Sequence, residues 1–227
     1  MAENIDFLKY VPIFSDLDDE TLTKISTLGT QNLYKKDSVI LSEHEIGSAL
    51  FVIVSGKVKI SRTGEGDREV ILTILGESDF FGEMAIIDGQ ARSATVKAME
   101  DSELFIIQRN DFLDLLYSHP EVSIALLKEL INRLRAADMK IKSLSLKDAE
   151  GKVASVILQL ADDVGKIKHG TVEIEKLPYQ HDLANMAGTS RETISRTLHS
   201  FAKKGLVELE GSRLRIIDYE KFKELFN

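Results

Sequence analysis

The chain has 227 residues, 43% of them hydrophobic, which excludes global disorder and allows one large domain or two ordinary ones. It has no cysteine, and its five histidines show no metal-ligand spacing, so disulfide frameworks, thiolate zinc sites and cysteine-ligated iron–sulfur clusters are excluded and no metal site is predicted. The net charge of −8 is uneven: residues 1–115 carry 11 basic and 21 acidic side chains, whereas residues 116–227 carry 18 and 16.

The N-terminal segment carries no targeting signal. It contains acidic side chains and no long apolar run, and no later apolar stretch could span a bilayer, so we expect a cytoplasmic protein that does not contact a membrane. The stretch "DLDDETLTKISTL" predicts a short helix with Asp16 or Asp18 as its cap. Its apolar side chains recur at helical spacing: Leu17, Leu22, Ile25 and Leu28.

Residues 31–107 have the pattern of antiparallel β structure. Short β-rich runs alternate with glycine-containing turns: "SVILSE", "ALFVIVSGKVKISR", "REVILTIL", "ARSATVKAM" and "SELFIIQ". The stretches "SGKVKI" and "TGEGDREV" are typical of tight hairpin connections. Many short strands with no long helix between them predict a closed or rolled antiparallel sheet.

A long helix is predicted from residue 118 to about Ser145. "SHPE" has the form of a capping box, with Ser118 as the cap, Pro120 in the first turn and Glu121 reaching back. One face of this helix carries a row of positions at alternating steps of three and four, all of them apolar except Asp138: Ile124, Leu127, Ile131, Leu134, Asp138 and Ile141. This heptad row predicts a helix pair, most simply a parallel homodimer, against the alternative of a helix packed on its own domain.

Asp138 interrupts that row with a carboxylate. A buried carboxylate without a partner costs several kcal/mol, so three interpretations remain open. The row opens there and leaves Asp138 in solvent, or Asp138 sets the register of the dimer, or it faces a ligand.

The domain boundary is placed at about Leu146. A second apolar helix, "KVASVILQLADDV", follows, and "GKIKHGTVEIEK" predicts a loop and a short strand. We therefore predict a β-roll domain at residues 1–117, a dimerisation helix and hinge at 118–146, and a third part at 147–227.

The third part contains the pattern of a winged helix-turn-helix. Ala184, Gly188 and Ile194 supply the small residue for close helix approach, the turn, and the apolar residue that locks the helix crossing. Ser190 caps the second helix and Gly205 closes it, after which "LVELEGSRLRII" predicts a hairpin wing.

The start of that second helix would enter a DNA major groove. Arg191 and Arg196 can each pair bidentately with guanine, Glu192 can accept from cytosine, and Ser195 shares their face. The alternative is an ordinary exposed helix with local ion pairs. Candidates for phosphate contact flank this helix: Gln180, His181, Ser190, Lys203 and Lys204.

The whole chain, in this order of parts, resembles the catabolite-activator/fumarate–nitrate regulator (CRP/FNR) family of bacterial transcription factors. Two motifs carry the resemblance: "FGEMAIIDGQARSATV" looks like the family's phosphate-binding cassette, and "GTSRETISRTL" is very close to its recognition helix. The resemblance implies an α+β fold with a cyclic-nucleotide-binding β-roll (a double-stranded β-helix, or jelly roll), a long dimerisation helix and a C-terminal winged helix-turn-helix.

The resemblance also implies that cyclic AMP or a related nucleotide binds in the roll. Backbone N–H groups near Gly82 would face the nucleotide, Glu83 would take the ribose 2′-hydroxyl, and Arg92 would pair with the cyclic phosphate beside Ser93. These residue types suit the task, because a guanidinium matches two phosphate oxygens and a carboxylate accepts from a hydroxyl. The alternative is a surface Arg–Glu pair across a β-turn. Phe81 and Met84 lie in the same cassette, next to Gly82 and Glu83, and are counted with the site.

The dimer helix departs from the family pattern. Where the cyclic AMP-dependent activator has adjacent Thr and Ser that meet the adenine, this chain has Ala137 and Asp138. Asp138 can accept from the adenine amino group or from guanine N1–H and N2–H₂, so cyclic AMP and cyclic GMP both remain open. In the recognition helix, Arg191, Glu192 and Arg196 match the activator branch, which implies a TGTGA-like half-site, whereas Ser195 matches the fumarate–nitrate branch.

We therefore predict a homodimeric, ligand-responsive regulator that binds double-stranded DNA, and RNA polymerase if it is an activator. The competing hypothesis keeps the fold without the switch: a constitutive or other-ligand DNA binder whose roll binds no cyclic nucleotide. An enzyme is not predicted, because the sequence shows no nucleophile–base pair, metal set or nucleotide-triphosphate loop.

Overall fold

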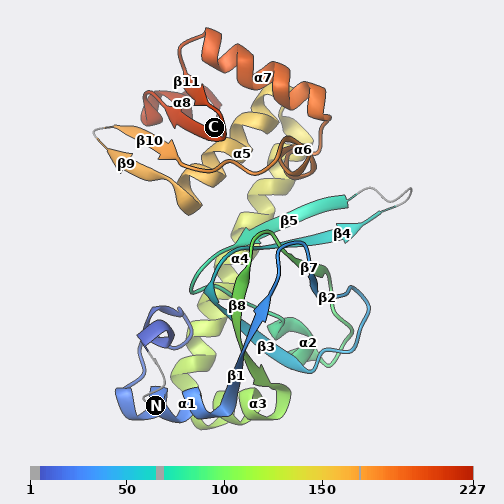
Figure 1. Ribbon diagram of the computed structural model, residues 1–227, viewed down its shortest axis with the longest axis vertical. Helices are drawn as coiled ribbons and strands as arrows, with labels where there is room; N and C mark the ends of the chain where they lie inside the picture. Colours follow the sequence, from blue (N-terminus) through green and yellow to red (C-terminus); the bar gives the residue numbers. More distant parts are fainter. Residues whose placement is uncertain (1–5, 65–68, 169, 227) are drawn as a thin grey trace. The chain divides into compact units, whose positions relative to one another are not determined.

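The computed structural model describes residues 6–64, 69–168 and 170–226 (Figure 1). The chain divides into two compact units, Met1–Arg135 and Ala136–Asn227. This division falls inside the long helix α4 (Pro120–Leu146), whereas the domain boundary predicted from the sequence is at about Leu146. Within the described ranges, no helix is long and apolar enough to cross a membrane.

The first unit contains the predicted roll. Its strands form two four-stranded antiparallel sheets, in the orders β1-β8-β3-β6 and β2-β7-β4-β5. Residues 65–68, the tip of the predicted "TGEGDREV" hairpin, lie outside the described residues, although β4 and β5 pair as expected. The strands are β1 (Gly29–Tyr34), β2 (Val39–Leu41), β3 (Ala49–Ser55), β4 (Val58–Thr63), β5 (Glu69–Leu75), β6 (Phe80–Phe81), β7 (Thr95–Ala98) and β8 (Ser102–Gln108).

Strand β3 is apolar without a break from Ala49 to Val54 because both faces of this part of the strand lie against a core. Phe51 and Ile53 point into the core between the two sheets, whereas Leu50 and Val52 belong to a second core on the other side of the sheet. Side chains alternate across a strand, so one run serves two cores.

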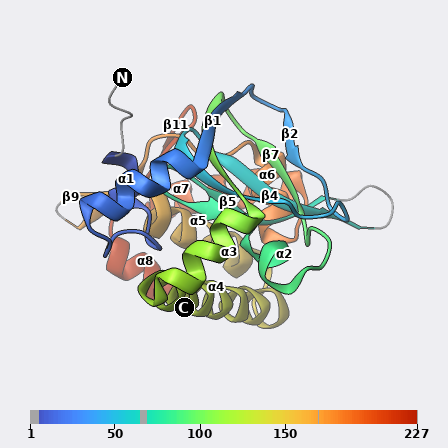
Figure 2. The same ribbon diagram turned by 90° about the horizontal axis from the view of Figure 1, so that it is seen from below.

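Helices close that second core. The 3₁₀ helix η1 (Asp6–Tyr10), α1 (Asp19–Leu28) and α3 (Arg109–Ser118) contribute to it, and Figure 2 shows α1 and α3 at the same end of the roll. The Asp18 carboxylate caps α1 as expected, because it accepts from the Thr21 backbone N–H at 2.7 Å.

The predicted capping box at the start of α4 is wrong. Ser118 is the last residue of α3, a helix that the sequence pattern does not predict, and its hydroxyl donates to the Asp114 carbonyl at 2.7 Å. Pro120 begins α4 as expected, and the Glu121 carboxylate lies 3.2 Å from His119 Nδ1. Ser118 is therefore engaged by the end of one helix and is unavailable to the next.

Helix α4 carries two apolar rows with different surroundings. Val122 and Leu126 are buried in the helix-side core of the first unit. The predicted heptad row faces elsewhere, and its members in this unit are 50–62% exposed: Ile124, Leu127, Ile131 and Leu134. The row that packs on the helix's own domain is therefore not the heptad row.

The second unit is built on a four-stranded antiparallel sheet in the order β11-β12-β10-β9. The predicted wing is the pair β11 (Val207–Glu210) and β12 (Arg213–Ile216), while the predicted loop and single strand are a hairpin of β9 (Lys166–Lys168) and β10 (Thr171–Ile174). The helices are α5 (Ala149–Val164), α6 (Gln180–Ala187), α7 (Arg191–Lys203) and α8 (Tyr219–Phe226). The α+β fold of roll, long helix and winged helix-turn-helix is thus confirmed.

Candidate ligand site and nucleic-acid interface

The candidate ligand site forms where β6 turns into the short helix α2 (Glu83–Asp88). Gly82 is the N-cap residue with φ +90°, a left-handed conformation that favours glycine. A Cβ at Gly82 would lie 2.8 Å from Arg92 Nη1 and 3.0 Å from the Ala49 carbonyl oxygen. Glycine is therefore required here both by the backbone conformation and by the close approach of the guanidinium.

Arg92 is buried within the roll, with 5% exposure. Its Nη1 donates to the Gly82 carbonyl at 2.7 Å and its Nη2 to the Ala49 carbonyl at 2.8 Å. Its Nε has no hydrogen-bond partner among the described residues, and none of their carboxylates forms an ion pair with it. Burial lowers the pKa of Arg92, partly offset by the charges of Glu83 and Glu45. A buried guanidinium without a bound anion is costly, which favours an anionic ligand at this point.

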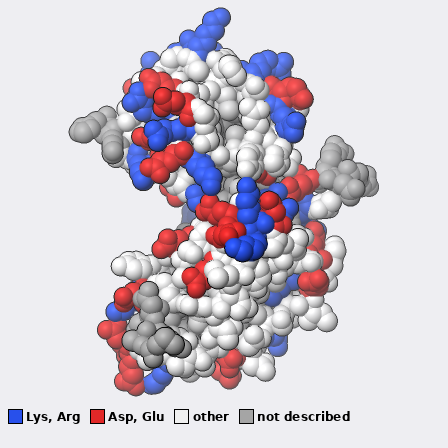
Figure 3. Space-filling model, in the orientation of Figure 1, with Lys and Arg blue, Asp and Glu red and all other residues white. Residues whose placement is uncertain are grey.

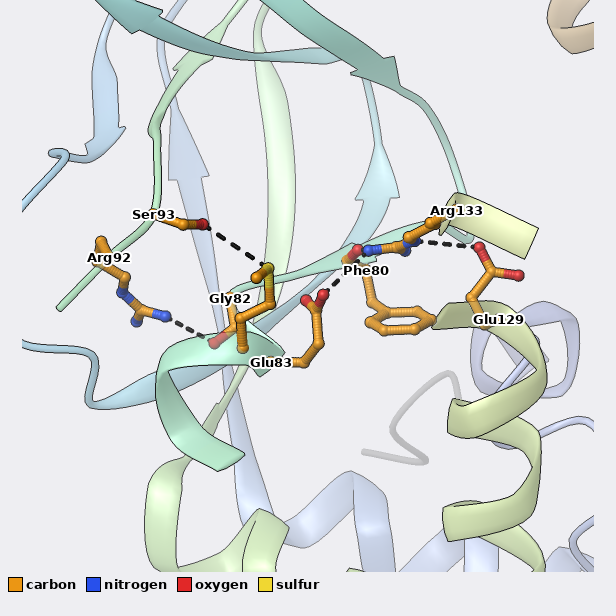
Figure 4. A network of polar contacts seen from close by, with 8 residues as sticks. Phe80, Gly82, Glu83, Arg92, Ser93, Glu129 and Arg133 are labelled. Carbon is orange, nitrogen blue, oxygen red and sulfur yellow. Dashed lines mark hydrogen bonds and ion pairs between the residues drawn. The ribbon is translucent and has the colours of Figure 1, made fainter. Parts of the chain in front are cut away.

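Glu83 does not pair with Arg92, so the alternative of a surface Arg–Glu pair across a turn is excluded. Glu83 is 3% exposed, and its Oε1 lies 3.3 Å from Nη1 of Arg133, a residue of α4 (Figure 4). Burial raises the pKa of Glu83, against the opposing effect of the Arg133 charge. The carboxylate that is predicted to accept from a ribose hydroxyl is therefore paired with a side chain of the long helix α4.

Arg133 is the residue of this site that sequence reasoning missed. Its Nη2 donates to the Phe80 carbonyl at 2.9 Å, its Nε pairs with Glu129 at 3.1 Å, and its guanidinium lies 4.5 Å from the centre of the Phe80 ring (Figure 4). The sequence did offer a reason to include it, because Arg133 lies one helical turn before the predicted ligand residue Ala137 and therefore on the same face of α4.

The remaining predicted ligand residues differ in their surroundings. Phe81 is buried and stacks on Phe51 with ring centres 5.1 Å apart, so its role is in the core. The exposed Ser93 hydroxyl lies 3.7 Å from the sulfur of Met84 (Figure 4), a half-exposed side chain on α2. Ala137 and Asp138 are exposed on the part of α4 that belongs to the second unit, and their contact with a base stays a prediction.

The predicted helix-turn-helix is formed by α6 and α7. Gly188 ends α6 with φ +59°, and the Ser190 hydroxyl caps α7 by accepting from the Thr193 backbone N–H at 3.2 Å. Ala184 and Ile194 are both buried, as a close helix crossing requires.

The predicted DNA-contacting side chains lie at the surface of this unit. Hydrogen bonding from its own backbone N–H and from the Ser190 hydroxyl holds the pKa of Glu192 below its usual range, so this carboxylate is an acceptor at neutral pH. Ser195 is half-buried, and the others are exposed: Gln180, His181, Ser190, Arg191, Glu192, Arg196 and Lys203. Each of these positions except Ser195 is therefore open to a nucleic acid.

Two further observations qualify the charge pattern. Lys204 pairs with Glu150 of α5, so this predicted phosphate contact is already engaged within the unit. Figure 3 shows blue and red side chains interspersed over the C-terminal unit, so no uniformly basic face marks a DNA surface from this side.

Across the described part of the chain, no group of three or more His, Asp or Glu side chains could hold a metal ion.

Comparison with known proteins gives the same two parts in the same order. A cyclic nucleotide-binding domain family matches residues 31–119, and a Crp-like helix-turn-helix domain family matches residues 151–225. The chain is 34% identical over 218 residues to the cyclic AMP receptor protein of Thermus thermophilus, covering 96% of this chain and 98% of that protein. It is 34% identical over 188 residues to the CRP-like cAMP-activated global transcriptional regulator of Mycobacterium tuberculosis, covering 83% and 84%.

Solved structures show the same architecture. The crystal structure of the Thermus thermophilus catabolite activator protein matches with a TM-score of 0.55 at 34% identity, covering 94% of this chain and 97% of that one. A CooA mutant from Carboxydothermus hydrogenoformans matches with a TM-score of 0.76 at 25% identity, covering 90% of each chain. With a roll, a helix-turn-helix and relatives that span nearly its full length, the chain belongs to the CRP/FNR family of DNA-binding transcription regulators, which carry a cyclic nucleotide-binding domain.

Proposed function

We propose that this protein is a homodimeric transcription regulator switched by a cyclic nucleotide, with cyclic AMP as the first candidate. The observation that carries the proposal is the buried Arg92 guanidinium, which has no carboxylate partner among the described residues and lies against the glycine turn at Gly82. A cyclic phosphate would supply the missing negative charge. Relatives whose names specify cyclic AMP support this ligand.

The contacts of Arg133 would connect a bound ligand to the long helix α4. The ribose hydroxyl would meet Glu83, and Glu83 is paired with Arg133 of α4. A ligand that changes the Glu83 contact therefore changes how the helix is held on the roll. Only a ligand with different affinities for two arrangements of the helix can switch the protein.

The exposed heptad row supports a homodimer. The apolar strip of Ile124, Leu127, Ile131 and Leu134 is 50–62% exposed among the described residues, and it has the spacing of a two-stranded coiled coil. A parallel pair would bring two copies of α7 to one DNA, so that two TGTGA-like half-sites are read one helical turn apart, about 34–36 Å.

Titration calorimetry with cyclic AMP and cyclic GMP at physiological salt tests the switch, with Arg92→Ala as the matched control. We expect one of the nucleotides to bind wild type, to bind the variant far more weakly, and to change wild-type affinity for a palindromic duplex. If neither nucleotide binds and Arg92→Ala leaves DNA affinity unchanged, the roll is a scaffold and the constitutive or other-ligand regulator replaces this proposal. A monomer mass at micromolar concentration in sedimentation would remove the homodimer.

A further inference from the structure

Two carboxylates share the guanidinium of Arg133. Glu83 Oε1 lies 3.3 Å from its Nη1 and Glu129 Oε1 lies 3.1 Å from its Nε, on opposite sides of the guanidinium in Figure 4. A charge-assisted N–H···O hydrogen bond is ordinarily about 2.7–2.9 Å long. Both contacts are longer than that, so neither carboxylate holds Arg133 alone, and one positive charge faces two negative charges.

Other contacts keep Arg133 from moving toward Glu83. Its Nη2 donates to the Phe80 carbonyl at 2.9 Å, and its guanidinium lies 4.5 Å from the centre of the Phe80 ring. Glu129 and Arg133 are one turn apart on α4, so the helix itself holds this pair together. Arg133 is therefore fixed at a point between the two carboxylates.

The two carboxylates have unequal access to water. The Glu83 side chain is 4% exposed, whereas the Glu129 side chain is 25% exposed. Water stabilises the charge of the more exposed group, so the charge of Glu83 depends more strongly on Arg133. Burial has the largest effect in raising the pKa of Glu83, and the Glu129 charge raises this pKa further. Glu129 therefore opposes the ionisation of Glu83.

Two other charged side chains face this cluster. The Arg92 charge lowers the pKa of Glu83, as the Arg133 charge does. Asp79 lies in the turn before β6, and burial raises its pKa, which the Arg133 charge lowers and the Glu129 charge raises. Asp79 thus responds to the same two side chains of α4, but Glu83 is the carboxylate predicted to meet a ribose.

We propose that Glu129 is a positioning residue for nucleotide binding, and that by sharing Arg133 with Glu83 it makes recognition of the ribose 2′-hydroxyl depend on pH. This inference rests on the proposed function, because it concerns the carboxylate that would accept from the ribose. An ionised carboxylate accepts from a hydroxyl more strongly than a neutral carboxyl group does. Discrimination against a 2′-deoxy nucleotide therefore rises with pH over the range in which Glu83 loses its proton.

The test measures this ribose discrimination as a function of pH. Titration calorimetry with cyclic AMP and 2′-deoxy cyclic AMP, from about pH 5 to about pH 8, gives the ratio of their two dissociation constants. The corresponding guanine pair is used if wild type binds cyclic GMP instead. For wild type the ratio should rise roughly tenfold over the transition, the difference between a charge-assisted and a neutral hydrogen bond.

The Glu129→Gln variant should undergo the same rise at lower pH. The amide keeps the length of the side chain and an oxygen that can accept from Arg133, but it removes the negative charge that opposes the ionisation of Glu83. At a pH below the wild-type midpoint, the variant should therefore discriminate between the two nucleotides several-fold better than wild type.

Glu45→Gln is the matched control. Glu45 is exposed, and its charge acts on Arg92: burial lowers the pKa of Arg92, and the charges of Glu83 and Glu45 raise it. Both nucleotides carry the phosphate that Arg92 is predicted to bind. Removing the Glu45 charge should therefore change the two affinities equally and leave their ratio, and its pH dependence, as in wild type.

Urea unfolding of the ligand-free protein gives an independent measurement. The difference in the free energy of unfolding between a protein with Glu83 and its Glu83→Gln variant is lost as the pH rises through the raised pKa of Glu83. In the Glu129→Gln background this loss should be complete at lower pH, because the Glu83 pKa is raised less. The two backgrounds should differ even without a nucleotide.

The outcomes separate the two hypotheses. If wild type binds neither cyclic AMP nor cyclic GMP at any pH, the proposed function fails and this inference fails with it. If a nucleotide binds but its ratio does not vary with pH, or if Glu129→Gln has the wild-type pH dependence, the proposed function stands and the role of Glu129 is overturned. A change in both affinities with an unchanged ratio indicates a general charge effect and also overturns that role.

Discussion

The two candidate sites of this protein place arginine in opposite environments. Arg92 in the roll is buried and donates to two backbone carbonyls, whereas Arg191 and Arg196 on α7 are exposed to solvent. A buried guanidinium is oriented before a ligand arrives, and it makes the ligand-free state less stable. An exposed one carries no such cost, because water solvates it until DNA displaces the water. In the proposed function, this difference would link ligand binding to the stability of the roll, and it would leave DNA binding independent of the stability of α7.

Replacing Arg92 should give the largest effect. Arg92→Met removes both charge-assisted hydrogen bonds that a phosphate would receive, each worth about 1.5–3 kcal/mol, so nucleotide affinity should fall by roughly a hundredfold or more. Stability of the ligand-free protein should change little, because the removal of an uncompensated buried charge is opposed by the loss of the two donors to the Gly82 and Ala49 carbonyls. Calorimetric titration and thermal unfolding measure the two quantities. Unchanged affinity would show that Arg92 serves only the fold.

Replacing Arg133 should give the second-largest effect, a loss of stability. Arg133→Gln leaves the Glu83 carboxylate buried without its cation, so the free energy of unfolding should fall by about 3 kcal/mol. Adding Glu83→Gln should recover much of that loss, while Glu129→Gln alone keeps the Glu83 pair and should cost far less. Urea unfolding of the set measures the coupling. Additive losses in the double variant would show that Glu83 and Arg133 do not act as a pair.

On the DNA side we expect a smaller effect that does not change stability. Arg196→Ala should weaken binding by about 1–3 kcal/mol and relax the preference for one guanine. Lys203→Ala is the matched control, since a phosphate contact should weaken all sequences alike and reduce the salt slope by about one. Binding to duplexes substituted at each half-site position distinguishes the two, and an unchanged guanine preference would remove Arg196 from the base contacts.

The smallest expected effect is a pH dependence in the roll. Because burial raises the pKa of Glu83 above its ordinary value near 4.5, the folded state holds this proton more tightly than the unfolded chain. Its contribution to the free energy of unfolding is fully present below that ordinary value and is lost as the pH rises through the raised pKa. The stability of wild type minus that of Glu83→Gln should therefore decrease as the pH rises over this window. Urea unfolding at a series of pH values measures it, and a difference that rises with pH would contradict the direction assigned to Glu83.

Much of the fold was predictable because it depends on local patterns. The apolar run around Phe51 is typical of a buried strand, Asp18 is a residue type that caps helices, and Gly188 is a residue type that ends them. The misses have a common cause. Helices α2, α3 and α8 lack long periodic patterns of their own, and α3 ends on Ser118, a residue whose pattern equally fits the start of α4.

The candidate ligand site also contains residues that the sequence predicts and one residue that it does not. The sequence predicted Gly82, Glu83 and Arg92 as ligand residues because they stand in one short motif, and their contact with a ligand stays a prediction. Arg133 was missed because it lies on another element, fifty residues from Glu83 in sequence, and only the packing of α4 on the roll brings the two together.

By itself the sequence determined the order of parts, the heptad row and the types of side chain available for a phosphate and for bases, because these depend on residue identity and short-range spacing. Only the tertiary structure decided which charges are paired. It buried Arg92 without a carboxylate partner among the described residues, joined Glu83 to Arg133 and joined Lys204 to Glu150. The physical reason is that an ion pair depends on distance and burial, and both arise only when elements far apart in the chain pack together.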